Sequence, residues 1–218
     1  MKQYNGEKAI ISLTSWKARI NTVCKTLFSL IDQCPGFHIV LVLSEEEFPK
    51  KEDELPENLK IFIDNDLIEV LWVYKNVKAM KKVLFTMDKY RDVPVISADD
   101  DCLYICNYAE ELYQKWLTDK NAAVRYTDFD HYDGYKGTQG PSTLYPPTSY
   151  HLFLSVLKNE KIIENFVAYD DAFLSNTLLN NQVKILSVAP KFCFRFHDEQ
   201  GAIHPNLRSV KIYEECYR

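Results

Sequence analysis

Short apolar, β-branched runs alternate with longer stretches of helical spacing along most of this chain. Strand-length runs are predicted at residues 9–13, 38–43, 68–73, 93–98, 122–126, 183–188 and 192–196. Helical spacing is predicted at about residues 23–31, 77–90, 108–117, 151–160 and 171–180. Such alternation is typical of βαβ units, which build a mainly parallel sheet flanked by helices. We therefore predict an α/β fold.

Two stretches interrupt this pattern. Residues 44–58 are acidic and lysine-rich with two prolines, and they predict a solvated loop or a short helix. Residues 127–150 contain glycines, several tyrosines and a Pro-Pro pair, so we expect a long irregular segment there. Long loops in compact domains usually carry function. The length of 218 residues fits a single domain spanning 1–218.

The composition narrows the classes of protein that this chain can represent. Hydrophobic residues make up 46% and charged residues 26%, which is typical of a globular protein rather than a disordered or membrane-spanning one. The net charge of −5 disfavours a nucleic-acid partner. No signal peptide or transmembrane segment is recognisable. The six cysteines form no CxxC pair, so a cytoplasmic location is expected. Cys102 and Cys106 fit a zinc site or, as we favour, two buried apolar side chains.

Three adjacent carboxylates, Asp99, Asp100 and Asp101, directly follow the apolar run at residues 93–98. In open α/β sheets, ligands bind outside the carboxyl ends of the strands. Adjacent carboxylates repel one another, and a divalent cation such as Mg²⁺ or Mn²⁺ relieves that repulsion while it binds a substrate diphosphate. The alternative is a turn whose aspartates cap the next helix. The sequence thus favours a metal site at this strand end.

A second acidic pair and two histidines lie further along the chain. Asp170 and Asp171 open a helical stretch, where carboxylates either interact with the helix dipole or provide a general base. His197 and His204 follow the last predicted strand. Each is either a further metal ligand or an ordinary surface histidine.

Polar residues after the first predicted strand, and lysines before the fourth, suit a nucleotide diphosphate. Thr14, Ser15, Trp16 and Arg19 supply hydroxyls, an aromatic ring and a guanidinium group. The stretch contains no glycine, which excludes a Walker loop and a dinucleotide-binding fingerprint. Four lysines are spaced to place two or three ammonium groups on a common helical face, where they would meet phosphates or solvent: Lys75, Lys78, Lys81 and Lys82.

Taken in order, these motifs resemble the successive blocks of GT-A-fold glycosyltransferases, especially bacterial enzymes of capsule and lipopolysaccharide assembly. The resemblance covers most of the chain. It is carried by Ile11-Ser12-Leu13-Thr14-Ser15-Trp16 with Arg19-Ile20, by Lys81-Lys82, by Ile96-Ser97-Ala98-Asp99-Asp100-Asp101, by Gly140-Pro141-Ser142-Thr143-Leu144-Tyr145-Pro146-Pro147 and by Ala168-Tyr169-Asp170-Asp171.

This resemblance implies a Rossmann-like nucleotide-binding part over about residues 1–105 and an acceptor and catalytic part over about 106–218. It implies that the DXD motif binds the nucleotide and the metal, with Asp99 toward the ribose, Asp100 near the ribose or donor sugar, and Asp101 on the cation. In inverting members a carboxylate of a later acidic pair is the acceptor base, which implies Asp171, with Asp170 beside it. Whether the reaction inverts or retains depends on where Asp171 points. The fold often takes its last metal ligand from a C-terminal histidine. Nucleotide contacts are implied for Thr14, Ser15, Trp16, Arg19, Lys81 and Lys82.

The expected activity is metal-dependent transfer of a hexose from a nucleotide-sugar, a UDP-sugar in particular, to a hydroxyl of a glycan or lipid-linked acceptor in surface polysaccharide synthesis. A peripheral membrane contact is compatible with such acceptors. Two other functions remain open: a metal-dependent phosphohydrolase, and a non-catalytic module that binds nucleotides or carbohydrates. The phosphohydrolases of the haloacid-dehalogenase kind carry a nucleophilic aspartate on the first strand, and residues 10–15 contain none.

Overall fold

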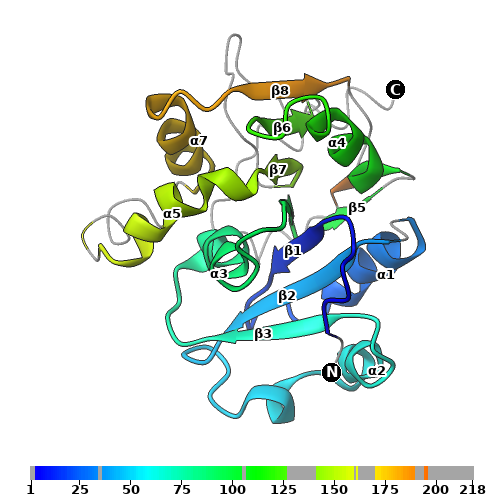
Figure 1. Ribbon diagram of the computed structural model, residues 1–218. Coiled ribbons are helices and arrows are strands. Elements are labelled where there is room, and N and C mark those ends of the chain that lie inside the picture. The colour runs from blue at the N-terminus through cyan, green and yellow to red at the C-terminus, as the bar shows by residue number, and fades with distance from the viewer. Residues whose placement is uncertain are drawn as a thin grey trace, which may run out of the picture.

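A seven-stranded sheet forms the centre of the molecule, with the strand order β3-β2-β1-β4-β7-β6-β8 (Figure 1). The computed structural model describes residues 3–33, 36–104, 107–126, 141–159, 161, 170–189 and 194–195. The strands of the sheet are β1 (Ile10–Thr14), β2 (His38–Ser44), β3 (Glu69–Val73), β4 (Val95–Ala98), β6 (Ala123–Tyr126), β7 (Thr143–Tyr145) and β8 (Ile185–Val188). Only β7 runs against its neighbours in this sheet. A separate antiparallel pair joins β5 (Cys102–Leu103) to β9 (Phe194–Arg195).

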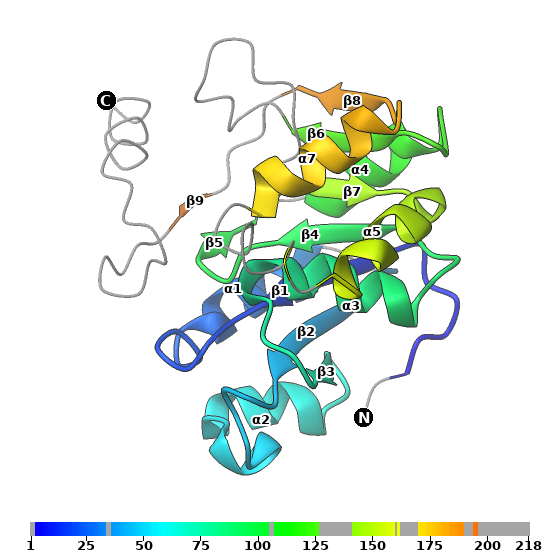
Figure 2. The same cartoon turned by 90° about the vertical axis from the view of Figure 1, so that its left-hand side faces the viewer.

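Helices cover both faces of this sheet, as the two perpendicular views show (Figures 1 and 2). One face is covered by α1 (Val23–Gln33), α2 (Glu57–Asp64) and α4 (Tyr108–Trp116). The other is covered by α3 (Lys81–Lys89), α5 (Tyr150–Leu157) and α7 (Asp170–Asn180). Three short 3₁₀ helices span Lys51–Glu54, Lys78–Met80 and Pro147–Ser149. In the described part of the chain, no helix is both long and apolar enough to cross a membrane.

The alternation of side chains along each strand divides the core into two layers. Ile11 and Leu13 of β1 pack with Leu27 of α1, whereas Ile10 packs with Val83 of α3 on the opposite face. All seven residues of β2 are buried, as expected for a strand with helices on both sides. The predicted α/β fold with a mainly parallel sheet is therefore confirmed.

Two elements differ from the pattern predicted by the sequence. β7 lies inside the stretch expected to be irregular, where its Leu144 is fully buried between β4 and β6. A three-residue strand is too short to show a period of two, so its residues gave no signal. The second is α2, which begins after Pro56, close to the end of the stretch at residues 44–58. Proline at that place pre-sets the backbone before a helix without losing a needed hydrogen bond.

A buried pair of hydroxyl groups joins α3 to the sheet. The hydroxyls of Ser12 on β1 and Thr86 on α3 lie 2.8 Å apart, and both residues are fully buried. This contact fixes the helix over β1 and β4. As a result, the first turn of α3 lies at the carboxyl end of the sheet, where Lys82 enters the site described below.

A buried polar cluster closes the opposite, amino end of the sheet. Glu69 opens β3, and its carboxylate accepts hydrogen bonds from Lys89 Nζ at 2.6 Å and Tyr90 Oη at 2.5 Å. His38, which opens β2, places Nε2 2.8 Å from the same carboxylate. Burial alone would raise the pKa of Glu69, but the hydrogen bonds to His38, Lys89 and Tyr90 lower it to about 2. The ionised form of Glu69 therefore stabilises the folded state.

Replacing Glu69 by glutamine is expected to cost about 3 kcal/mol of unfolding free energy at neutral pH. Because the folded pKa is depressed, this contribution is complete above the unfolded pKa near 4.5 and is lost as the pH falls toward 2. Urea unfolding of both proteins across the acid range measures it. A difference between them that stays constant over that range would show that Glu69 titrates normally.

Candidate active site

The three aspartates form a tight turn immediately after β4, at the carboxyl end of the sheet. β1 and β4 are parallel neighbours, with Leu13 opposite Ala98, so the residues that follow both strands emerge side by side. Ser15 Oγ donates a hydrogen bond of 2.6 Å to Asp100 Oδ2 across this junction. The aspartates after β4 and the polar loop after β1, which the sequence predicted separately, are thus in direct contact.

Arg19 neutralises the inner part of the turn. Its Nη1 donates to Asp100 Oδ1 at 2.6 Å and lies 3.2 Å from Asp101 Oδ2. Burial raises the pKa of Asp100, the Arg19 charge and the Ser15 hydrogen bond oppose that rise, and the charges of Asp101 and Asp99 add to it. Asp100 is therefore an anchored, buried group, only 6% exposed, that holds the turn against the loop after β1.

Lys82 brings the outer carboxylate of the turn together with the second acidic pair. Its Nζ donates to Asp99 Oδ1 at 2.5 Å, and the lysine side chain is only 3% exposed. Burial would lower the pKa of Lys82, but the charges of Asp99, Asp170 and Asp171 outweigh burial and raise it. A buried, charged lysine thus lies within the field of two acidic segments that are far apart in sequence.

Asp170 and Asp171 occupy the first turn of α7, as the sequence predicted for the start of that helix. Burial raises the pKa of Asp170, the Lys82 charge lowers it, and the Asp99 charge raises it again. Asp170 therefore interacts with both members of the Lys82–Asp99 ion pair. The pair thus lies in the first turn of a helix, as one interpretation predicted, and near the turn after β4, while its role as a general base stays a prediction.

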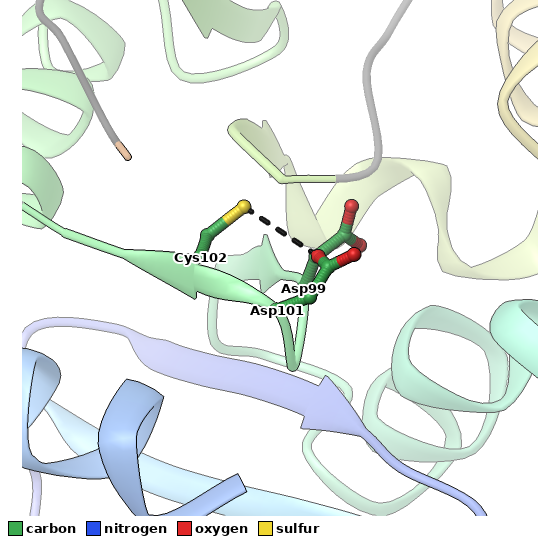
Figure 3. A group of neighbouring side chains, drawn as sticks. All are labelled: Asp99, Asp101 and Cys102. Carbon is green, nitrogen blue, oxygen red and sulfur yellow. Dashed lines mark hydrogen bonds between the residues drawn. The ribbon is translucent and has the colours of Figure 1, made fainter. Parts of the chain in front are cut away.

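The donor set of this turn suits a divalent cation. Carboxylate oxygens of Asp99 and Asp101 and the thiol of Cys102 all lie within 4.8 Å of one another, and Figure 3 shows these side chains at the end of the turn. Cys102 Sγ donates a weak hydrogen bond of 3.7 Å to Asp101 Oδ1. The basic side chains at this site are Arg19 and Lys82. They are outnumbered by the acidic side chains, which are Asp99, Asp100, Asp101, Asp170 and Asp171. This excess of negative charge and the two carboxylates fit a hard cation, whereas the Cys102 thiol is a soft ligand that such a cation does not favour.

Three residues predicted to bind the nucleotide make other contacts. Lys81 is buried and donates to Glu47 at 2.7 Å and to Asn76 at 3.1 Å, away from the aspartates. Thr14 Oγ1 donates to the carbonyl of Val42 at 2.7 Å. The backbone carbonyl of Trp16 accepts from the amides of Arg19 and Ile20, which closes the loop after β1.

The common helical face expected for two or three of the four lysines is interrupted, because α3 begins at Lys81 and the Lys78–Met80 segment is a 3₁₀ helix. Lys75 precedes both elements. Lys81 and Lys82 are buried and point to different carboxylates, so neither of them faces solvent. His197, His204 and Cys106 lie outside the described residues, and Cys102 is a buried thiol rather than half of a disulfide.

Two residues that hold the backbone of the aspartate turn, Thr26 and Tyr104, were not predicted from the sequence. Thr26 Oγ1 on α1 donates to the carbonyls of Asp100 and Cys102, and Tyr104 Oη accepts from the amide of Asp99. Nothing in the sequence marks these side chains, because a threonine in a helix and a tyrosine after a strand are common in any core.

Comparisons with known proteins support the fold of this chain. No protein-family model matches the sequence, and no curated protein matches it significantly. Among solved structures, it is similar to the mannosyltransferase PcManGT from Pyrobaculum calidifontis in complex with GDP-Man and Mn²⁺, with a TM-score of 0.62 and 15% identity. The match covers 89% of this chain and 59% of that one, so the chain spans less than two thirds of the mannosyltransferase.

A second similar structure is GalNAc-T7 with UDP, GalNAc and Mn²⁺, at 17% identity, with 55% of this chain and 22% of that chain covered. Its TM-score of 0.44 is too low to support an argument. The likeness to PcManGT is one of fold, and it agrees with the GT-A fold predicted from the sequence.

Proposed function

We propose that this protein is a metal-dependent glycosyltransferase that takes a hexose from a nucleotide-sugar. The observation that carries the proposal is the meeting of two distant acidic segments around Lys82, at the carboxyl end of a sheet of GT-A type. One segment follows β4 and the other opens α7. A metal-dependent sugar transferase of the inverting type uses one acidic group to hold the donor diphosphate through a cation and another to accept a proton from the acceptor hydroxyl.

Asp99 and Asp101 would hold the divalent cation, Mn²⁺ or Mg²⁺, which when bound neutralises the diphosphate of the leaving nucleotide. Asp100 keeps its contacts with Ser15 and Arg19 and fixes the turn. His197 is our candidate for a further ligand in preference to His204. It follows β9 by two positions, a reach of about 7 Å, and β9 pairs with β5 directly after the aspartates.

Asp171 is our candidate for the acceptor base. Asp170 interacts with Lys82 and Asp99, so we assign it to the ionic cluster that orients the first turn of α7. Asp171 is then placed beside the cluster, where it accepts the proton of the acceptor hydroxyl as that oxygen attacks the anomeric carbon. The Lys82 charge opposes the rise that burial causes in the pKa of Asp170, and its ion pair with Asp99 holds the outer carboxylate in position.

In this proposal, the two parts of the chain bind different substrates. Residues up to about 105 bind the nucleotide, with Ser15, Trp16 and Arg19 on its side of the site, and residues from about 106 receive the acceptor. We propose a UDP-sugar as donor and a glycan or lipid-linked acceptor in surface polysaccharide synthesis in the cytoplasm, with peripheral membrane contact. Because PcManGT is described with GDP-Man, GDP-sugars belong in any test.

The proposal is tested by release of nucleoside diphosphate from a panel of UDP- and GDP-sugars, with Mn²⁺ or with EDTA. We expect slow Mn²⁺-dependent cleavage of one donor in the wild type. Asp171→Asn should bind that donor normally in calorimetry but lose turnover by about 10²-fold or more. Loss of donor binding in this variant would instead assign Asp171 a structural role in the start of α7.

The other two functions receive less support from the same residues. The end of β1 presents Thr14 and Ser15 rather than the nucleophilic aspartate of a haloacid-dehalogenase phosphohydrolase. A non-catalytic module would bind a donor in the panel without cleaving it. Mn²⁺-dependent binding with no release of nucleoside diphosphate would therefore favour the binding module.

A further inference from the structure

The turn that carries Asp99, Asp100 and Asp101 is held by a relay of hydrogen bonds from α1. Thr26 Oγ1 donates to the Asp100 carbonyl at 3.0 Å and to the Cys102 carbonyl at 2.8 Å. The Asp100 carbonyl belongs to the peptide that precedes Asp101, and the Cys102 carbonyl to the peptide that follows Cys102. One buried hydroxyl therefore ties the backbone before Asp101 to the start of β5, and so restrains the backbone that carries the Asp101 side chain.

A second branch of the relay holds the other end of the same turn. Ser29, one helical turn after Thr26, donates through Oγ to the Thr26 carbonyl at 2.7 Å and accepts from the Tyr104 amide at 3.0 Å. Tyr104 Oη in turn accepts from the amide of Asp99 at 2.7 Å. The ring of Tyr104 is buried against Tyr108, with centroids 4.3 Å apart, so its hydroxyl has a fixed position.

These contacts reach both candidate metal ligands through the backbone rather than through their carboxylates. Thr26 is fully buried and Tyr104 is 2% exposed, and their hydroxyls are engaged with the backbone of the turn, so both act through the turn rather than as ligands. A small divalent cation demands a narrow range of ligand positions. Groups that orient ligands from behind typically change metal affinity by about 10-fold to 100-fold when they are removed.

We infer that Thr26 and Tyr104 are positioning residues that pre-set Asp101 and Asp99 for the divalent cation, an inference that rests on the proposed function. The relay ties the ligand turn to α1, which packs on the sheet through Val23, Leu27 and Leu30. The metal site is thereby built on a rigid helix instead of on a free loop. Thr26 restrains the backbone next to Asp101, and Tyr104 restrains the backbone amide of Asp99.

The test measures the dissociation constant for Mn²⁺ alone, by the electron paramagnetic resonance signal of free Mn²⁺, in the full-length protein. Thr26→Val keeps the shape of the side chain and removes its hydroxyl, and we expect about 10-fold weaker binding. Thr26→Ser restores the donor and should stay within about 3-fold of the wild type. Tyr104→Phe removes the acceptor of the Asp99 amide and supplies an independent variant, with the same direction of change.

Ser149→Ala is the matched control, because Ser149 is fully buried and its Oγ donates to the Pro146 carbonyl at 2.7 Å, after the far end of β7. It should lose thermal stability like Thr26→Val but bind Mn²⁺ like the wild type. Wild-type affinity in both Thr26→Val and Tyr104→Phe, or equal weakening in Ser149→Ala, would overturn the inference. A wild-type protein that binds no Mn²⁺ would instead contradict the proposed function.

Discussion

Replacing Asp101 by asparagine is expected to reduce sugar transfer by about 10³-fold, because the cation loses a charged ligand and the donor diphosphate loses its neutralising partner. Asparagine keeps the size of the side chain, and Asp100 still holds the turn through Ser15 and Arg19. The fold should therefore remain. Turnover of the donor is measured at increasing Mn²⁺, and circular dichroism checks the fold.

Asp119→Asn is the matched control for this variant. Asp119 lies after α4, beyond the opposite end of the sheet, where its carboxylate is 3.5 Å from Lys184 Nζ. It should retain both activity and Mn²⁺ dependence. Normal turnover in Asp101→Asn would refute the assignment of Asp101 as a metal ligand, whereas loss of activity in Asp119→Asn would show that any loss of an aspartate disturbs the protein.

Replacing Lys82 by methionine is expected to destabilise the protein by about 3–5 kcal/mol, since removal of one partner of a buried ion pair leaves the other buried charge uncompensated. Here the loss leaves Asp99, Asp170 and Asp171 without their shared cation. Part of the stability should return on addition of Mn²⁺, which replaces the lost positive charge. Urea unfolding with Mn²⁺ and with EDTA measures both effects.

Lys81→Met is the control for this variant, because Lys81 is the adjacent residue and equally buried, but pairs with Glu47. It should also lose stability, and Mn²⁺ should leave its difference from the wild type unchanged. Equal responses of the two variants to Mn²⁺ would show that the electrostatic link between Lys82 and the aspartate turn is absent.

Much of this fold could be predicted from the sequence, because the apolar runs are long enough to show their periods. The strand that ends at Ala98 and the helix that opens at Asp170 are both where the pattern placed them. The general rule that ligands bind at the carboxyl ends of strands then located the aspartates correctly in the sheet. The short strands β5 and β7 were missed, since two or three residues carry no periodicity.

The contacts within the site could not be predicted, because they depend on strand register and on helix rotation. Ser15 meets Asp100 because Leu13 is in register with Ala98, which no residue pattern fixes. Lys81 and Lys82 are adjacent in sequence, yet only the rotation of α3 decides that Lys82 faces Asp99. Both lysines were predicted to bind a nucleotide, and that role stays a prediction.

The central claim is that the aspartate turn binds a nucleotide-sugar through a divalent cation. Its most direct test is a thermal-shift measurement of the wild-type protein with UDP- and GDP-sugars, each with Mn²⁺ and with EDTA. We predict that at least one donor raises the melting temperature by several degrees with Mn²⁺ and none does so with EDTA. No stabilisation by any donor, or the same stabilisation in EDTA, would contradict this account.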